Sequence, residues 1–433
     1  MIVDERQRSG PAAAPVWFAL VATFIGLFFG YLLKAQCTRL AWDGAQYARL
    51  CYNDIQPLFH VRGVERGQLP YRDATLEYPV LTGEFMYLVG GLLRRVAAPA
   101  GNTDANYFHL SALLLAPFAF AVTLVLRPHV TRERLMIWAL GTPIVLYAFH
   151  NWDLIAVAGG VVGLIALEQR RLTASGAALS LGASAKLFPG FLLPGALLGE
   201  WAAGRRREAA RIAGAFALLA AVVNVPWMLV SWEGWRRIWT FHAERYPDFG
   251  SVWFWVAHHA RRLVPATFWD VGQPGYRDFV GVASLILFIA GSAWFLATGW
   301  RRRNEPQGYP VAAVGLGVLV TFLLVSKVHS PQYALWIAPL LAMLEVPWRR
   351  LLAYLAADVA VYISGFYWFT VFSAPAPAWK GIFEVTVLVR AVTLVGLAMS
   401  AMTAVRVRPA EVTAAPAAHR ASSRRPAAAG DAG

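Results

Sequence analysis

Residues 16–33 read VWFALVATFIGLFFGYLL, an eighteen-residue run without a charged side chain. A helix of this length nearly crosses a hydrocarbon core about 30 Å thick. Similar runs recur along the chain, and 58% of its 433 residues are hydrophobic, whereas soluble domains contain about 45–50%. The runs are continuous and do not alternate in polarity, which disfavours a transmembrane β-barrel. The sequence therefore predicts an all-α polytopic membrane protein.

The apolar runs predict about twelve spans, with both chain ends on the cytoplasmic side. We expect these spans at roughly 16–35, 79–95, 107–126, 135–149, 152–168, 173–203, 209–230, 279–299, 309–326, 333–348, 351–372 and 381–405. Two long polar segments, 36–78 and 231–277, then lie outside and carry interfacial helices. We expect one transmembrane domain over 1–405. The segment 406–433, rich in Ala, Pro, Arg and Ser, is predicted to be a disordered cytoplasmic tail.

Segment 173–203 is long for one span and carries Lys186 and Pro189 near its centre. It is either one helix or two short helices that meet at an outer turn near Lys186. In the second case the sequence HNWD at 150–153 also lies outside, and a neighbouring span becomes a half-helix or re-entrant. Helix breaks at membrane depth are tolerated only where protein or water surrounds them. Both versions therefore predict that 150–189 lines a cavity.

Positive charge is concentrated in short clusters between the apolar runs. The chain carries 39 Lys and Arg against 25 Asp and Glu, a formal net charge of +14. The clusters are Arg170-Arg171, Arg205-Arg206-Arg207, Arg301-Arg302-Arg303, Arg349-Arg350 and Arg406-Val-Arg408. This distribution is the positive-inside pattern of membrane proteins, and we expect no nucleic-acid partner. The arginines at 94–95 and 127–134 conflict with it, because one predicted helix separates them.

Two cysteines, Cys37 and Cys51, lie in the first polar segment. An extracytoplasmic loop permits a disulfide, but we expect two free thiols in apolar surroundings. No Cys/His spacing typical of zinc is present, and we expect neither a metal nor a cofactor. Walker, dinucleotide-binding, HExxH and GxSxG motifs are also missing from the sequence, which argues against an ATP-driven pump and a protease.

Ionisable and aromatic residues are densest in the first polar segment, which reads CYNDIQPLFHVRG at 51–63, GQLPYRD at 67–73 and EYP at 77–79. Ionisable groups beside a bilayer are costly unless they are solvated, paired or functional. A carboxylate there can accept a proton from a hydroxyl, and aromatic rings suit either sugar stacking or an interfacial belt. The candidate residues are Asp43, Asp54, Arg62, Tyr71, Arg72, Asp73, Glu77 and Tyr78.

Other polar groups interrupt the later apolar runs. His150 and Asp153 can form a functional polar pair or a structural hydrogen bond that closes a hairpin. Lys186, one of four lysines, either faces an anion such as a lipid phosphate or extends to the interface. Lysine supplies a point charge to phosphate, and His and Gln can donate hydrogen bonds. Further candidates in 240–245 and 326–333 are His242, Arg245, Lys327, His329, Gln332 and Tyr333.

Taken in order, these segments resemble glycosyltransferase family 87, the bacterial polyprenol-phosphate-mannose-dependent α-mannosyltransferases of the GT-C superfamily. The similar segments are Asp54-Ile-Gln-Pro-Leu-Phe59, Gly67-Gln-Leu-Pro-Tyr-Arg-Asp73, Glu77-Tyr78-Pro79, Asn151-Trp-Asp153, Lys186-Leu-Phe-Pro189, Phe241-His242 with Arg245, and Lys327 through Tyr333. The chain departs from the family at Phe59, where Tyr is frequent, and at Pro79-Val80, where many members have two prolines. These departures bear on acceptor specificity more than on the type of reaction.

The resemblance implies a GT-C-type bundle in the cell membrane with an active site facing outward. Its donor is a sugar on a polyprenyl monophosphate, and its acceptor is an envelope glycolipid or glycan. Asp54 is the first choice for the base that deprotonates the acceptor, with inversion at the anomeric carbon, and Asp43 is the second. The resemblance implies that the donor phosphate is bound by five residues: Lys327, His329, Gln332, Lys186 and Arg245. Apart from membrane lipids and these substrates, no partner or oligomeric state is indicated.

Two alternatives belong to other functional classes. A flippase or transporter of a lipid-linked saccharide is expected to show paired repeats and charges at mid-membrane, whereas here the motifs crowd one face. A non-catalytic scaffold of the cell envelope has no need of a base and a phosphate-binding set. Both are therefore less favoured than a transferase.

Overall fold

The computed structural model describes residues 13–97, 101, 103–263, 267–370 and 377–404. The described residues form helices and connecting segments, and none of them forms a strand. The predicted tail 406–433 lies outside this part of the chain. The helices are α1 (Val16–Ala35), α2 (Ala45–Ala48), α3 (Ile55–Val61), α4 (Val80–Val96), α5 (Asp104–Leu126), α6 (Arg132–Ala139), α7 (Thr142–Tyr147), α8 (Asp153–Glu168), α9 (Leu172–Ala185), α10 (Leu193–Ala202), α11 (Arg206–Val230), α12 (Trp232–Glu244), α13 (Val252–Leu263), α14 (Pro274–Arg301), α15 (Val311–Val325), α16 (Ala334–Met343), α17 (Trp348–Thr370) and α18 (Pro377–Thr403).

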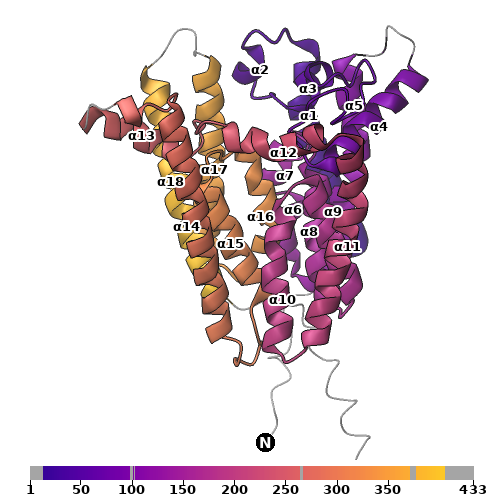
Figure 1. Ribbon diagram of the computed structural model, residues 1–433, viewed down its shortest axis with the longest axis vertical. Coiled ribbons are helices and arrows are strands. Elements are labelled where there is room, and N and C mark those ends of the chain that lie inside the picture. The colour runs from indigo at the N-terminus through magenta and orange to yellow at the C-terminus, as the bar shows by residue number, and fades with distance from the viewer. Residues whose placement is uncertain (1–12, 98–100, 102, 264–266, 371–376, 405–433) are drawn as a thin grey trace, which may run out of the picture.

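The long helices stand side by side (Figure 1). By length and composition, six helices among the described residues can cross a membrane: Val16–Arg39, Asp104–His129, Arg206–Val230, Pro274–Arg301, Trp348–Thr370 and Ala378–Thr403. They coincide with six of the predicted spans, while the other predicted spans are shorter or interrupted helices. An all-α polytopic membrane protein is therefore confirmed.

The centre of the bundle is apolar on all sides, whereas some outer helices expose their apolar residues. Every residue of α16 is buried, and most of α15 is buried too. By contrast, Ile212 is the buried residue of α11. A helix that is hydrophobic all round belongs in a core or against lipid, so the exposed apolar faces of α11 and α14 suit contact with acyl chains.

The predicted segment 173–203 is two helices, α9 and α10. The helix α9 ends at Ala185, Lys186 is extended (φ −158°, ψ 137°), and a 3-10 turn, Phe188–Leu192, leads into α10. Proline has no N–H to continue the hydrogen-bond ladder, so Pro189 favours the break. Of the two versions that the sequence left open, the structure shows two helices. The turn near Lys186 lies beside the start of α8, because Lys186 pairs with Asp153.

The helix α4 lies at the upper end of the bundle, on the right in Figure 1. Near its start, the Thr82 hydroxyl donates to the Ala185 carbonyl at 2.8 Å. Near its other end, Arg94 donates to the Val64 carbonyl of the first polar segment. The predicted span 79–95 therefore does not connect the two ends of the bundle. The helix α4 has 17 mostly apolar residues, and a count of apolar residues alone does not distinguish it from a membrane span, which explains the wrong prediction. Because α4 does not cross the bundle, the arginines at 94–95 and those at 127–134 need not lie on the same side of the membrane.

The predicted span 135–149 is interrupted in a similar way. It consists of α6 and α7, which are separated at Leu140 and Gly141. A Cβ on Gly141 would come within 2.1 Å of the Ile137 carbonyl oxygen, so the chain needs glycine at this close approach.

Cys37 and Cys51 form a disulfide, with their Cα atoms 5.6 Å apart. The expectation of two free thiols is therefore wrong. The end of α1 continues as a 3-10 turn over Gln36–Arg39, and the chain folds back so that Cys51 reaches Cys37. Both side chains are buried, as expected, but a separation of 14 residues along the chain does not by itself reveal their proximity.

Candidate functional site

Asp54 lies at the start of α3, at the upper end of the bundle. Its backbone N–H donates to the His150 carbonyl at 2.7 Å. The Tyr52 hydroxyl donates to Oδ1 at 3.0 Å, and the Tyr78 hydroxyl approaches Oδ2 at 3.4 Å. Burial raises the pKa of Asp54, and the positive charge of Lys186 opposes that rise. The carboxylate is thus held in a fixed position and made more basic than an exposed aspartate.

Lys186 and Asp153 form a close ion pair next to Asp54. Their Nζ and Oδ1 atoms are 2.5 Å apart, and the Trp336 indole N–H donates to Oδ2 of Asp153 at 2.9 Å. The ammonium group also lies 5.3 Å from the ring centre of Tyr78, 5.7 Å from that of Tyr333 and 5.5 Å from that of Trp336. These are cation–π distances, so Lys186 is held between aromatic rings and a carboxylate.

Three parts of the chain bring five residues together. We call Tyr52, Asp54, Tyr78, Asp153 and Lys186 the Asp54 cluster. Its members come from the first polar segment, the start of α8 and the end of α9. The sequence placed Asp54, Tyr78, Asp153 and Lys186 in separate motifs, and the fold joins them at one place.

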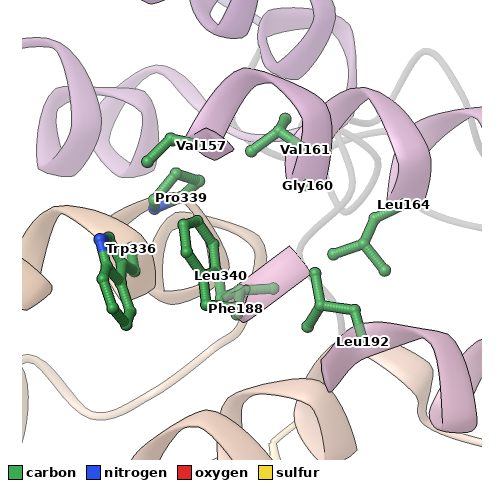
Figure 2. A pocket seen from close by; sticks show the side chains of 9 residues that line it. All are labelled: Val157, Gly160, Val161, Leu164, Phe188, Leu192, Trp336, Pro339 and Leu340. Carbon is green, nitrogen blue, oxygen red and sulfur yellow. The ribbon is translucent and has the colours of Figure 1, made fainter. Parts of the chain in front are cut away.

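A small apolar cavity lies between α8, the turn at 188–192 and α16 (Figure 2). Its volume is about 10 Å³, roughly the space of a single water molecule. The Phe188 ring stacks on Trp336 with centroids 4.6 Å apart. Apart from the indole nitrogen of Trp336 and the ring nitrogen of Pro339, the side chains drawn in Figure 2 are hydrocarbon or aromatic carbon. This packing holds Trp336, whose indole N–H donates to Asp153. The cavity is too small for a sugar.

Two arginines, Arg245 and Arg277, lie close enough to Lys327 to affect its charge near the second polar segment; we call the three residues the cation group. The Lys327 ammonium donates to the Ala243 carbonyl at 2.7 Å. Partial burial lowers the pKa of Lys327, as do the charges of Arg277 and Arg245. Arg277 donates to Asp278 at 2.8 Å. Like charges gathered in this way repel one another, and Asp278 compensates them in part, because its charge raises the pKa of Lys327.

His329 and Gln332 are buried beside the aromatic rings that surround Lys186. The His329 ring stacks on Tyr333 with centroids 6.2 Å apart. Burial, together with the charge of Arg390, holds the pKa of His329 well below its usual value. His329 is therefore neutral near pH 7 and can supply a hydrogen bond but not a charge. Gln332 accepts a hydrogen bond from Ser330.

A second polar set connects α12 to the first polar segment. Arg62 and Glu77 form an ion pair with 2.8 Å between Nε and Oε2. Nε2 of His242 lies 3.1 Å from the Glu77 carbonyl oxygen. The Tyr71 hydroxyl donates to the Tyr78 carbonyl at 3.0 Å. These predicted residues border the Asp54 cluster through Tyr78.

Three predicted residues lie apart from the Asp54 cluster. Asp43 is exposed, and its carboxylate accepts from the Ala45 N–H at 3.3 Å. Arg72 and Asp73 form an exposed pair with each other at 2.8 Å. These contacts are typical of a helix start and a solvated turn.

Sequence reasoning did not identify Arg277 or Lys34 as candidate residues. Lys34 is fully buried near the end of α1, and a lysine within an apolar run was an available signal. Arg277 follows a proline at the start of a span, where it resembles an ordinary interfacial arginine. No group of three His, Cys, Asp or Glu side chains in the described part of the chain is arranged to hold a metal ion.

Comparison with known proteins identifies the family. No curated protein matches the chain. The model of glycosyltransferase family 87 matches residues 85–326, which is more than half of the chain. This range contains Asp153, Lys186 and Arg245, while Asp54 precedes it and Lys327 follows it. The chain therefore belongs to glycosyltransferase family 87, a GT-C-type family, and is a membrane glycosyltransferase.

Proposed function

We propose that this glycosyltransferase moves mannose from a polyprenyl-monophosphate donor to a hydroxyl group of an envelope glycolipid or glycan. The observation that carries the proposal is the environment of Asp54. Its carboxylate is half-buried, receives hydrogen bonds from Tyr52 and Tyr78, and has a raised pKa. A general base works best when its pKa approaches the operating pH.

In the proposed reaction, Asp54 accepts the proton of the acceptor hydroxyl. The acceptor oxygen attacks the anomeric carbon as the bond from that carbon to the phosphate oxygen breaks. Polyprenyl phosphate leaves with the bonding electrons, and the sugar inverts its anomeric configuration. A well-placed general base contributes roughly 10²–10⁴-fold to such a rate.

The leaving group gains negative charge, and the cation group is suited to stabilise it. Lys327, Arg245 and Arg277 can place positive charge near a phosphate, because both arginines lie close enough to Lys327 to lower its pKa. Neutral His329 and Gln332 can add hydrogen bonds. Preorganised donors directed at developing charge are often the largest contribution to catalysis. Lys186 is already paired with Asp153. Its positive charge stabilises the ionised form of Asp54 and adds to the positive charge beside the donor site.

Two features support an outward-facing site in the cell membrane. The Cys37–Cys51 disulfide lies in the first polar segment, and disulfides persist in oxidising compartments. At the other end of the bundle, Glu200 pairs with Arg170 and Arg205, which belong to clusters expected to be cytoplasmic.

The donor class can be tested with purified protein in nanodiscs. Labelled polyprenyl-phospho-mannose and labelled nucleotide-mannose are supplied separately, with membrane lipid extract as acceptor. We expect label to move to a new glycolipid from the lipid donor alone. Transfer from the nucleotide sugar, or transfer from neither when other polyprenyl-phospho-sugars also fail, contradicts the proposal.

A further inference from the structure

Lys34 is a fully buried lysine near the outer end of α1. Its ammonium group donates to the Tyr52 carbonyl at 2.8 Å and to the Tyr362 hydroxyl at 2.8 Å, and it lies 3.3 Å from Nδ1 of His150. These three partners match the three N–H donors of an ammonium group. All three partners are neutral groups when His150 is unprotonated, and burial lowers the pKa of His150.

Two of these partners are also the residues that hold Asp54. The Tyr52 hydroxyl donates to the Asp54 carboxylate at 3.0 Å. The His150 carbonyl accepts from the Asp54 backbone N–H at 2.7 Å. Lys34 is therefore linked to Asp54 in two ways: through Tyr52, which holds the Asp54 carboxylate, and through His150, which holds the Asp54 backbone N–H. Lys34 does not itself touch the reacting atoms.

The chain just before Asp54 is anchored at three consecutive residues. The Leu50 carbonyl accepts from the Tyr362 hydroxyl, Cys51 is joined to Cys37, and the Tyr52 carbonyl accepts from Lys34. Leu50 has φ +56°, a left-handed conformation that non-glycine residues adopt only when their surroundings impose it. Segment 50–52 is thus held in place by α1 and α17.

A buried cation is an expensive way to fill space in an apolar helix. Methionine has a similar length and would pack without desolvating a charge. The position of Lys34 therefore calls for a role in which the ammonium group itself is needed.

We propose that Lys34 is a positioning residue for sugar transfer, and that with Tyr362 it holds segment 50–52 and His150 so that the Asp54 carboxylate meets the acceptor hydroxyl. This inference rests on the proposed function of Asp54 as the base.

The test compares Lys34→Met and Tyr362→Phe with the wild type in the transfer assay with polyprenyl-phospho-mannose. Misplacing a catalytic group by about 1 Å can lower the rate about 100-fold. We expect kcat to fall about 100-fold in Lys34→Met and about 10-fold in Tyr362→Phe. The donor KM should stay within about twofold, because the cation group is unchanged.

Lys380→Met is the matched control. Lys380 is also a lysine beside a histidine ring, with 3.3 Å to Nε2 of His258, but it contacts no member of the Asp54 cluster in the described part of the chain. It should keep kcat within about twofold of the wild type.

Unchanged kcat in Lys34→Met, or a change confined to donor KM, overturns the inference. If Lys34→Met does not fold, Tyr362→Phe decides alone, and normal kcat in that variant overturns it. An inactive Asp54→Asn with a normal Lys34→Met refutes this inference but leaves the proposed function intact. An active Asp54→Asn refutes the base assignment, and the inference fails with it.

Discussion

The ion pair between Lys186 and Asp153 should be strongly coupled, because both side chains are removed from water. Their exposed fractions are 16% and 1%, and Nζ lies 2.5 Å from Oδ1. At an effective dielectric constant of about 20, two unit charges at that distance attract by roughly 7 kcal/mol. Desolvation offsets much of this attraction, so the pair adds little net stability, but breaking it leaves an uncompensated buried charge at a cost of about 3–5 kcal/mol.

A double-mutant cycle measures this coupling. Asp153→Asn leaves Lys186 without its carboxylate, and Lys186→Met leaves Asp153 with the Trp336 indole as a partner. We expect each single variant to lower the unfolding free energy by about 3–5 kcal/mol. The double variant removes both charges, so its loss should be smaller than the sum of the two single losses by at least about 3 kcal/mol.

The assay is SDS-induced unfolding in mixed micelles, followed by tryptophan fluorescence. The exposed Arg72–Asp73 pair is the control, and its coupling should be too small to measure. Single effects that add within about 0.5 kcal/mol for Lys186 and Asp153 would refute the reasoning. That result would mean that water or another group compensates these charges.

Three further predictions concern the donor site, the disulfide and metal dependence. Lys327→Met should raise donor KM about 10–100-fold, because a charge-assisted contact of about 1.5–3 kcal/mol is lost; an unchanged KM in initial-rate measurements argues against phosphate binding there. Replacing Cys37 and Cys51 together by Ser should lower the unfolding free energy by about 3 kcal/mol in the same SDS titration, as expected for a loop of about 15 residues, and an unchanged midpoint contradicts this. Transfer should persist in EDTA, whereas loss that a divalent ion restores contradicts a metal-free reaction.

Much of the fold follows from local features of the sequence. Continuous apolar runs predicted the membrane helices, and Lys186 with Pro189 left open either one helix or the two helices that the structure shows, α9 and α10. Both signals are local, because helix length and proline geometry depend on adjacent residues. The helix α4 was misjudged because hydrophobicity alone does not say whether both ends of a helix lie on one side.

The site was only partly predictable, because its geometry depends on contacts between distant segments. The motifs named Asp54, Asp153 and Lys186, but nothing in them indicated that Lys186 pairs with Asp153. The Cys37–Cys51 disulfide depends on the fold of the intervening loop. Lys34 could have been noticed as an intramembrane lysine, but its partners Tyr52, His150 and Tyr362 come from three separate segments.

The assignment of Asp54 as the base is tested most directly by turnover and donor binding measured on the same preparations. Wild type, Asp54→Asn and Asp43→Asn are compared in nanodiscs with labelled polyprenyl-phospho-mannose. We predict that Asp54→Asn binds donor normally and loses about 10²–10⁴-fold in turnover. Asp43→Asn, which alters an exposed carboxylate, should stay within about twofold of the wild type. Full turnover in Asp54→Asn, or a comparable loss in Asp43→Asn, would contradict the assignment.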